Sequence, residues 1–229
     1  MDKDRAVTAG EREDIYRFLS TLCLRPPSDA LISMIREGSI LSSLGDEGSY
    51  IRLFVDQARE ASNLKDELES EYTAIFALPS GVLPHESAYV DKNKRLGGRA
   101  TISVGKFYER AGADILDSSA EMPDHLGMEL EFMGFLCGIE RELWEKERVA
   151  LQKCIEIQKA FLDEHLLKWV YPCCEKIMET ATYGFYKAIA HFTIEFMRAE
   201  EGHVAELHAE ICGVEKGKRE WRNDEIQTF

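Results

Sequence analysis

The sequence predicts an all-α protein, a helical-bundle-like single globular unit of about eight to ten helices. Along most of the 229 residues, apolar side chains recur at intervals of three and four, which is the period of an amphipathic helix. No run of residues alternates between apolar and polar in the way that a half-buried strand requires. The hydrophobic content of 45% and the aromatic content of 10% are enough to fill the core of a chain of this length.

Two helices are expected at the start of the chain. Thr8 and Glu11 have the spacing of a capping box, so the first helix should begin there and continue until Pro26–Pro27 stops it. Ser28 is a favourable N-cap for a second, short helix, and Gly38 is a suitable residue to end it.

Three further helices are expected over 50–61, 64–77 and about 101–111. Before the last of these, residues 79–98 contain several prolines and glycines and predict a long loop. The apolar and aromatic residues within this loop indicate that it is ordered, because long loops in compact helical proteins are usually either functional or disordered.

A polar segment at 113–123 is the expected hinge between two halves of one domain, 1–112 and 124–229. Asp124 is expected to cap a helix whose apolar positions continue to Leu143. Three more helices follow in the pattern, at about 149–168, 171–180 and 182–200, before a charged tail that is expected to fray after Gly213.

The formal net charge of −14, from 42 acidic and 28 basic residues, argues against a nucleic-acid-binding protein. The charge is unevenly placed, because residues 121–147 hold eight acidic and two basic side chains, a net of −6. On a helix with one apolar face, this segment is either a solvated surface or an acidic rim beside an apolar groove. A groove of the second kind would attract a cationic partner.

The sequence also indicates a cellular compartment. The six cysteines form no Cys-x-x-Cys pair and are expected to be reduced, buried thiols. The first residues lack the apolar region of a secretory signal, and the longest apolar run, 132–139, is too short to cross a bilayer. We therefore expect a cytoplasmic protein without membrane insertion.

Motifs for nucleotide chemistry are weak in this sequence. Neither a P-loop nor a dinucleotide-binding glycine motif occurs. Gly97–Gly98 precede a predicted helix beside Lys94, Arg95 and Arg99, a combination that could bind an anion but is more typical of an ordinary turn.

Metal chemistry is a minor alternative. Glu200 and His203 have the Glu-x-x-His spacing of di-iron bundles, and His125 and Glu129 share a helix face. A di-iron site needs two such pairs and two more glutamates, so a helical metalloenzyme using these four residues is disfavoured. We expect no metal, no cofactor and no catalytic residues, and hence a protein that is not an enzyme.

The segment Pro123-Asp-His-Leu-Gly-Met-Glu-Leu-Glu-Phe-Met133 resembles the signature helix of the TorD/DmsD-type redox-enzyme maturation chaperones, which are related to the NarJ-type nitrate reductase assembly proteins. Other elements occur in the order of that family: Tyr72-Thr-Ala-Ile-Phe76, Pro84-His-Glu-Ser-Ala-Tyr89, Phe107-Tyr108, Phe161-Leu-Asp-Glu-His-Leu166 with Trp169, and Phe185-Tyr186. Two positions depart from the family pattern, Ile75 where leucine is common and His85 where an aromatic residue is common. These departures concern the substrate preference more than the family.

The resemblance implies a cytoplasmic chaperone of anaerobic respiration. Such a chaperone binds the twin-arginine signal peptide and the apo form of a molybdopterin-dependent oxidoreductase, and assists cofactor insertion before export. Weak guanine nucleotide binding is a further implication of the family. The partner is thus expected to be the catalytic subunit of a molybdopterin oxidoreductase.

A twin-arginine peptide has a basic region and an apolar region, so its site should combine carboxylates with an apolar groove. The resemblance and this requirement together give the candidate peptide-binding residues Tyr72, Ile75, Phe76, Pro84, Glu86, Ser87, Tyr89, Pro123, Asp124, His125 and Glu129. Core packing is an equally good interpretation of Phe76 and Tyr108, whereas Tyr89 is expected at the surface. The Pro-Asp-His segment could instead be a structural hinge and cap.

Two alternatives remain beside the metalloenzyme. One is a NarJ-type assembly factor for a reductase subunit that is not exported. The other is a structural helical adaptor that binds a folded partner and ignores signal peptides.

Overall fold

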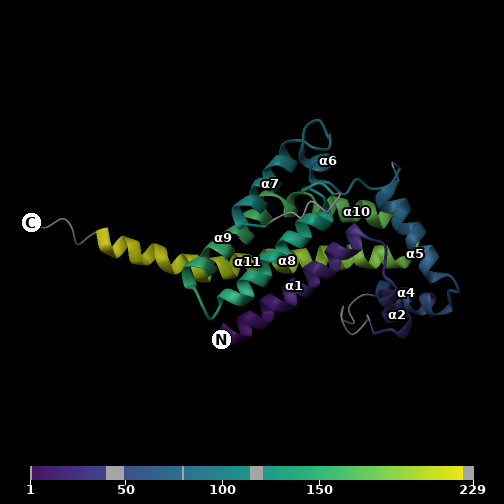
Figure 1. Cartoon of the computed structure of the whole chain (residues 1–229), viewed down its shortest axis with the longest axis horizontal. Helices are drawn as coiled ribbons and strands as arrows, with labels where there is room; N and C mark the ends of the chain where they lie inside the picture. Colours follow the sequence, from purple (N-terminus) through teal and green to yellow (C-terminus); the bar gives the residue numbers. More distant parts are fainter. Residues whose placement is uncertain (1, 40–48, 79, 114–120, 224–229) are drawn as a thin grey trace, which may run out of the picture.

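The computed structural model describes residues 2–39, 49–78, 80–113 and 121–223 (Figure 1). These residues form helices and no strand, so the predicted all-α class is confirmed. The elements are α1 (Asp2–Leu24), α2 (Asp29–Glu37), α4 (Ser49–Glu60), α5 (Leu64–Tyr72), the π-helical turn η1 (Thr73–Ala77), α6 (Glu86–Val90), α7 (Arg99–Ala111), α8 (Leu126–Leu143), α9 (Arg148–Glu164), the 3-10 turn η2 (Leu166–Lys168), α10 (Val170–Thr180) and α11 (Gly184–Asn223).

The two predicted N-terminal helices differ in how well their starts were predicted. Helix α1 begins at Asp2 and not at Thr8, whose hydroxyl donates to the carbonyl of Asp4 inside the helix. Acidic residues in the first turn favour this earlier start, because they face the positive end of the helix dipole. The caps of α2 are confirmed: the Ser28 side chain accepts the Leu31 amide, and Gly38 takes the left-handed conformation, with φ of 78°.

Helices also occur where loops were expected. The predicted loop at 79–98 contains the short helix α6, and α11 continues to Asn223 instead of ending near residue 200. The extension is stabilised by packing, since Leu207 and Ile211 lie with Trp144 in a second, smaller hydrophobic cluster. Most of the predicted hinge, residues 114–120, lies outside the described residues.

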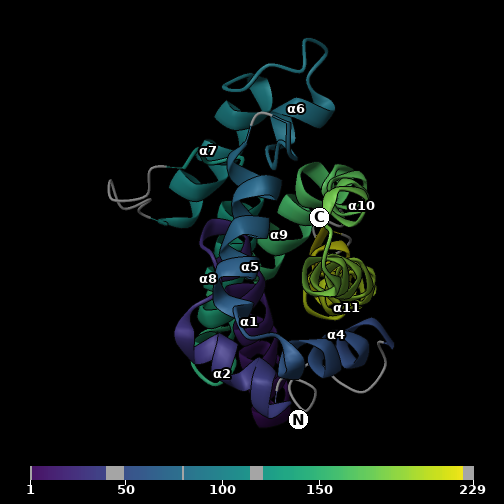
Figure 2. The ribbon, with the colours of Figure 1, turned by 90° about the vertical axis from the view of Figure 1, so that its right-hand side faces the viewer.

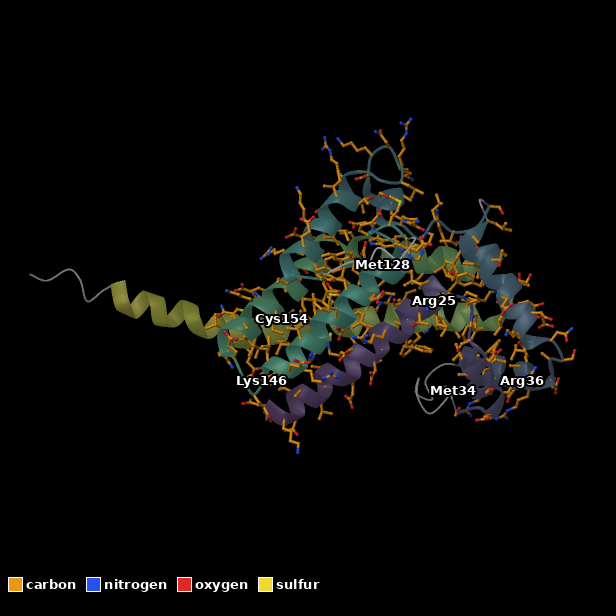
Figure 3. The ribbon with its side chains drawn as sticks, in the orientation of Figure 1. Arg25, Met34, Arg36, Met128, Lys146 and Cys154 are labelled. Carbon is orange, nitrogen blue, oxygen red and sulfur yellow. The ribbon has the colours of Figure 1, made fainter. Side chains whose placement is uncertain are left out.

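Helices α1 and α8 pack against each other in antiparallel orientation, and three glycines of α8 allow the close approach. A Cβ atom on Gly127 would lie 2.5 Å from Leu24 Cγ, and one on Gly138 would lie 3.1 Å from a Glu13 oxygen. Figure 3 shows the pairing, with Arg25 at the end of α1 close to Met128 near the start of α8. This contact brings the start of α8 to the C-terminal end of α1.

A buried ionic network ties α1 to three other helices. Arg12, which is 5% exposed, donates to Glu140 on α8 at 2.7 Å, to Gln158 on α9 at 2.8 Å and to Glu200 on α11 at 2.8 Å. The Tyr16 hydroxyl also donates to Glu200, at 2.9 Å. Glu200 therefore has a structural role, since its carboxylate accepts hydrogen bonds from these donors.

The six cysteines are buried thiols, as the sequence predicted. Among the described residues, no helix is both long enough and apolar enough to cross a membrane. Figure 2 shows that α6 and α7 lie at the opposite end of the molecule from α2 and α4, with the ends of α1 and α8 between them.

Candidate functional site

Two segments that are separated in the sequence join at the starts of α6 and α8. The Glu86 amide donates to the Asp124 carbonyl and the Leu126 amide donates to the Pro84 carbonyl, both at 2.8 Å. His85 and His125 form an isolated antiparallel bridge between these bonds. The structure therefore brings together two of the predicted segments, 84–89 and 123–129, which we call the α6–α8 junction.

Asp124 stabilises the start of α6 and not the start of α8, so its predicted role as the cap of α8 is wrong. Its Oδ2 accepts the Ser87 amide at 3.0 Å, and the residue is fully buried. Burial disfavours the ionised form, but His85, Ser87 and Thr101 around the carboxylate stabilise it and lower its pKa to about 2. Asp124 is thus a buried, ionised carboxylate.

His125 is the residue that caps α8. Its Nδ1 accepts the Gly127 amide at 3.1 Å. Burial, followed by the neighbouring His85, lowers the pKa of His125 to about 3, and the charge of Asp124 opposes this only partly. The ring is therefore neutral at physiological pH, which is the form that a hydrogen-bond acceptor at a helix start requires.

Glu86 and Glu129 lie behind the junction. Glu86 contacts His165 Nδ1 at 2.7 Å, and His165 Nε2 lies 3.1 Å from the Ser103 hydroxyl. Glu129 accepts the Trp169 indole N–H at 3.1 Å. Burial, and then the charge of Glu86, raise the pKa of Glu129.

The three predicted carboxylates are thus brought together but not exposed. Glu86 is 2% exposed, and Asp124 and Glu129 are 0% exposed. The acidic segment 121–147 is accordingly not a uniform rim, since part of its charge lies inside the protein. The expectation that these carboxylates directly face a surface groove is not met by this arrangement, and their role at the site is to hold the junction together.

The predicted apolar residues divide between the core and the surface. Ile75 is 0% exposed and belongs to the core, whereas Tyr72 and Phe76 are half-buried, with ring centroids 5.2 Å apart. The Tyr72 hydroxyl donates to the Cys23 carbonyl at 3.3 Å, and burial raises its pKa to about 12. Tyr108 is buried, which confirms the core interpretation for that residue.

The remaining candidates lie around the junction. Tyr89 is half-buried, and its ring centroid lies 5.4 Å from that of Trp169 and 5.4 Å from Lys176 Nζ. Ser87 and Pro84 are buried, and the Pro123 carbonyl accepts the Tyr108 hydroxyl at 2.8 Å. These contacts connect the junction to α7 and α10.

Sequence reasoning missed an acidic pocket of about 430 Å³ between α5, η1 and the start of α11. Its lining includes Asp66, Glu67 and Glu71, together with Ile75 and Tyr183, and none of the described residues that line it is basic. The spacing of Glu67 and Glu71, four apart in a predicted helix, was the available signal, because it places both on one face.

Glu71 is the buried member of this acidic pocket. Its Oε1 accepts the amides of Thr182 and Tyr183 at 2.7 and 2.6 Å, so it caps the start of α11. Its Oε2 is buried without a hydrogen-bond partner in the described part of the chain. Burial raises the pKa of Glu71, and the two amides and the charge of Lys187 act against this rise. The pocket therefore offers an acceptor to a cationic group.

The four residues of the disfavoured metalloenzyme alternative, His125, Glu129, Glu200 and His203, are not gathered into one group among the described residues. Within the described ranges, the group of possible metal ligands that lie together is His85, Glu121 and His125, and it excludes Glu129, Glu200 and His203. The basic residues beside Gly97–Gly98 are exposed at the start of α7, where Gly98 is the cap residue.

Comparisons with known proteins agree with this chain's motifs. The family model for the nitrate reductase delta subunit matches residues 44–175, more than half of the chain. Chaperone protein TorD of Vibrio cholerae serotype O1 is 25% identical over 211 residues, covering 87% of this chain and 94% of that protein. TorD of Vibrio atlanticus is 25% identical over 218 residues, which cover 89% of this chain and 99% of that protein.

A solved structure from Archaeoglobus fulgidus, described as that of a candidate redox enzyme maturation protein, is also similar. It is 21% identical, with a TM-score of 0.39, and the match covers 63% of this chain and 82% of the other. The family match and the TorD similarity over most of the chain confirm the relationship that the ordered motifs indicated. This chain belongs to the nitrate reductase delta subunit family.

Proposed function

We propose that this protein is a cytoplasmic chaperone that binds the twin-arginine signal peptide and the apo form of a molybdopterin-dependent oxidoreductase before export. The observation that carries the proposal is the α6–α8 junction, where the two most family-like segments of the chain bond to each other. The similarity to TorD chaperones over nearly the whole chain supports the same role.

The acidic pocket suits the arginines of such a peptide. Its three carboxylates include the unpartnered Oε2 of Glu71, and the exposed ring of Tyr183 lies at its edge, 41% exposed. A guanidinium group binds carboxylates through paired hydrogen bonds and also stacks on aromatic rings. We therefore place the twin arginines in this pocket.

The apolar region of the peptide would lie along η1 and the segment that follows it. Leu78 and Leu83 are each 49% exposed, and the half-buried rings of Tyr72 and Phe76 belong to the same part of the chain. This segment leads from the acidic pocket to the α6–α8 junction, since Ile75 lines the pocket and the Val82 amide donates to the Ile75 carbonyl. An extended peptide could contact both.

The buried carboxylates of the junction are positioning residues in this account. Asp124 fixes the start of α6, and Glu86 and Glu129 fix the packing of α6 and α8 against His165 and Trp169. They hold the segment that the peptide contacts, without contacting the arginines themselves.

Isothermal titration calorimetry with a synthetic twin-arginine signal peptide tests the proposal. The double variant Asp66→Asn/Glu67→Gln removes two charges of the pocket, and Glu145→Gln/Glu147→Gln removes two exposed charges elsewhere as a matched control. Because a charge-assisted hydrogen bond contributes about 1.5–3 kcal/mol, the pocket variant should weaken binding about tenfold or more. The control variant should bind like the parent.

A peptide with both arginines replaced by lysine should also bind more weakly, because an ammonium group cannot form the paired contacts. Equal binding of both peptides, or equal loss in both double variants, would contradict the pocket. Absence of binding to any twin-arginine peptide, with retained binding to an apo-reductase lacking it, would identify the NarJ-type assembly role instead.

A further inference from the structure

Three side chains with metal-ligand chemistry, two of them buried, meet at the α6–α8 junction. His85 precedes α6, His125 precedes α8, and Glu121 lies four residues before His125. The two imidazole rings are edge to face, with centroids 5.0 Å apart. Each of the three residues offers one ligand atom, and these atoms all lie within 4.8 Å of one another.

Two of the buried polar atoms beside this group, His85 Nδ1 and Asp124 Oδ1, lie 3.8 Å apart and make no hydrogen bond in the described part of the chain. A buried polar atom without a partner is rare and calls for an explanation. A histidine that binds a metal through one ring nitrogen commonly donates its other N–H to a carboxylate, which fixes the ring. A small approach of His85 to Asp124 would form this pair and satisfy both atoms.

We propose that His85, His125 and Glu121 bind a divalent transition-metal ion such as Zn²⁺, with Asp124 orienting His85 from behind. Two imidazoles and one carboxylate are the donor set that zinc sites with an open coordination position use. Tetrahedral Zn²⁺ with bonds of about 2.0–2.2 Å separates its ligand atoms by roughly 3.3–3.6 Å. The ligand atoms must therefore approach one another by about 1.5 Å at most, and Glu121, which is exposed, is free to make much of that movement.

The ion would compete with the hydrogen bond between the Gly127 amide and His125 Nδ1. The Nδ1 lone pair of His125 accepts the Gly127 amide, and a neutral imidazole has only one lone pair available in the ring plane. Metal binding either takes this lone pair or moves the ring proton onto Nδ1, and both release the Gly127 amide. The Gly127 amide thus reports on the site directly.

The site would link the two predicted halves of the chain. His85 belongs to the segment 1–112, and His125 belongs to the segment 124–229. An ion shared between them would reinforce the backbone bonds of the α6–α8 junction. This inference does not rest on peptide binding, and its test uses the metal alone.

Titration of the chelator-treated full-length protein with Zn²⁺ tests the site by calorimetry. We expect one Zn²⁺ per chain and a visible absorption spectrum of tetrahedral type with Co²⁺ as the probe. Glu121→Gln should weaken binding about tenfold or more, and Asp124→Asn should weaken it by about 10–100-fold, as is typical when an orienting residue is changed. Glu131→Gln, at another exposed glutamate, is the matched control and should bind like the parent.

His85→Ala should abolish stoichiometric binding, and the Gly127 amide resonance should shift when Zn²⁺ is added. Because Glu121 is exposed, its variant remains informative even if the histidine variant does not fold. Binding that is unchanged by Glu121→Gln, a stoichiometry other than one, or a Gly127 amide that does not respond would overturn the proposal.

Discussion

Replacement of Arg12 by leucine should strongly destabilise the fold. Arg12 supplies the positive charge that compensates Glu140 and Glu200, which are 2% and 3% exposed. Leucine fills part of the same space but leaves both carboxylates buried without a counter-charge. The perturbation therefore removes at once the Arg12 hydrogen bonds that join α1 to α8, α9 and α11.

The size of the effect follows from what each carboxylate retains. Removing one partner of a buried ion pair costs about 3–5 kcal/mol. Glu140 keeps hydrogen bonds from Trp144 and Gln158, at 3.2 and 2.9 Å, and Glu200 keeps the one from Tyr16. These remaining donors favour the lower end, about 3 kcal/mol, which corresponds to a decrease in Tm of roughly 6–12 °C for a chain of this size.

Urea denaturation followed by circular dichroism at 222 nm measures this loss. The control is Arg17→Leu, because Arg17 pairs with Glu13 on the same helix and its side chain is 57% exposed. That change should alter the free energy of unfolding by about 0.5 kcal/mol or less. Adding Glu140→Gln and Glu200→Gln to Arg12→Leu should restore part of the stability, since neither position then carries an uncompensated buried charge.

Two results would contradict this prediction: a loss of less than about 1 kcal/mol for Arg12→Leu, or a further loss of stability when the two glutamates are neutralised. Either result would mean that the carboxylates do not depend on the guanidinium for their charge compensation.

Two other predictions concern packing and burial. Gly127→Ala should destabilise the protein by about 1–3 kcal/mol, because the added Cβ would lie 2.5 Å from Leu24 Cγ. Gly202→Ala, in open space, should be neutral or slightly stabilising. Thermal unfolding of both variants measures the difference, and an equal change in the two would contradict the role of close packing at Gly127. The six buried thiols should react with a thiol reagent at pH 8 only after denaturation. Burial raises the pKa of Cys154 and Cys173 to about 12, so little reactive thiolate is present in the folded protein. Rapid reaction of the native protein would contradict the burial of these cysteines.

Local signals in the sequence were sufficient for elements that depend on neighbouring residues. Ser28 and Gly38 bound α2 as expected, because a cap and a left-handed glycine act within one turn of the helix. Asp124 was assigned to the wrong helix, since its acceptor role is decided by Ser87, 37 residues away. The sequence alone does not show that His125, and not the neighbouring Asp124, caps α8.

Long-range contacts account for the other differences. Arg12 and Glu200 are 188 residues apart, so no pattern in the sequence indicates that they form an ion pair. The extension of α11 depends on a cluster that includes Trp144, which belongs to another part of the chain. The family motifs indicated which segments matter, and the structure shows that their carboxylates lie beneath the surface.

Hydrogen exchange of the full-length protein with and without a twin-arginine signal peptide is the most direct test of the proposed peptide site. We expect slower exchange in α5, in η1 and in the segments that form the α6–α8 junction, with the C-terminal part of α11 unchanged. Protection confined to α9 and α11, or no protection in α5 and the junction at saturating peptide, would contradict it.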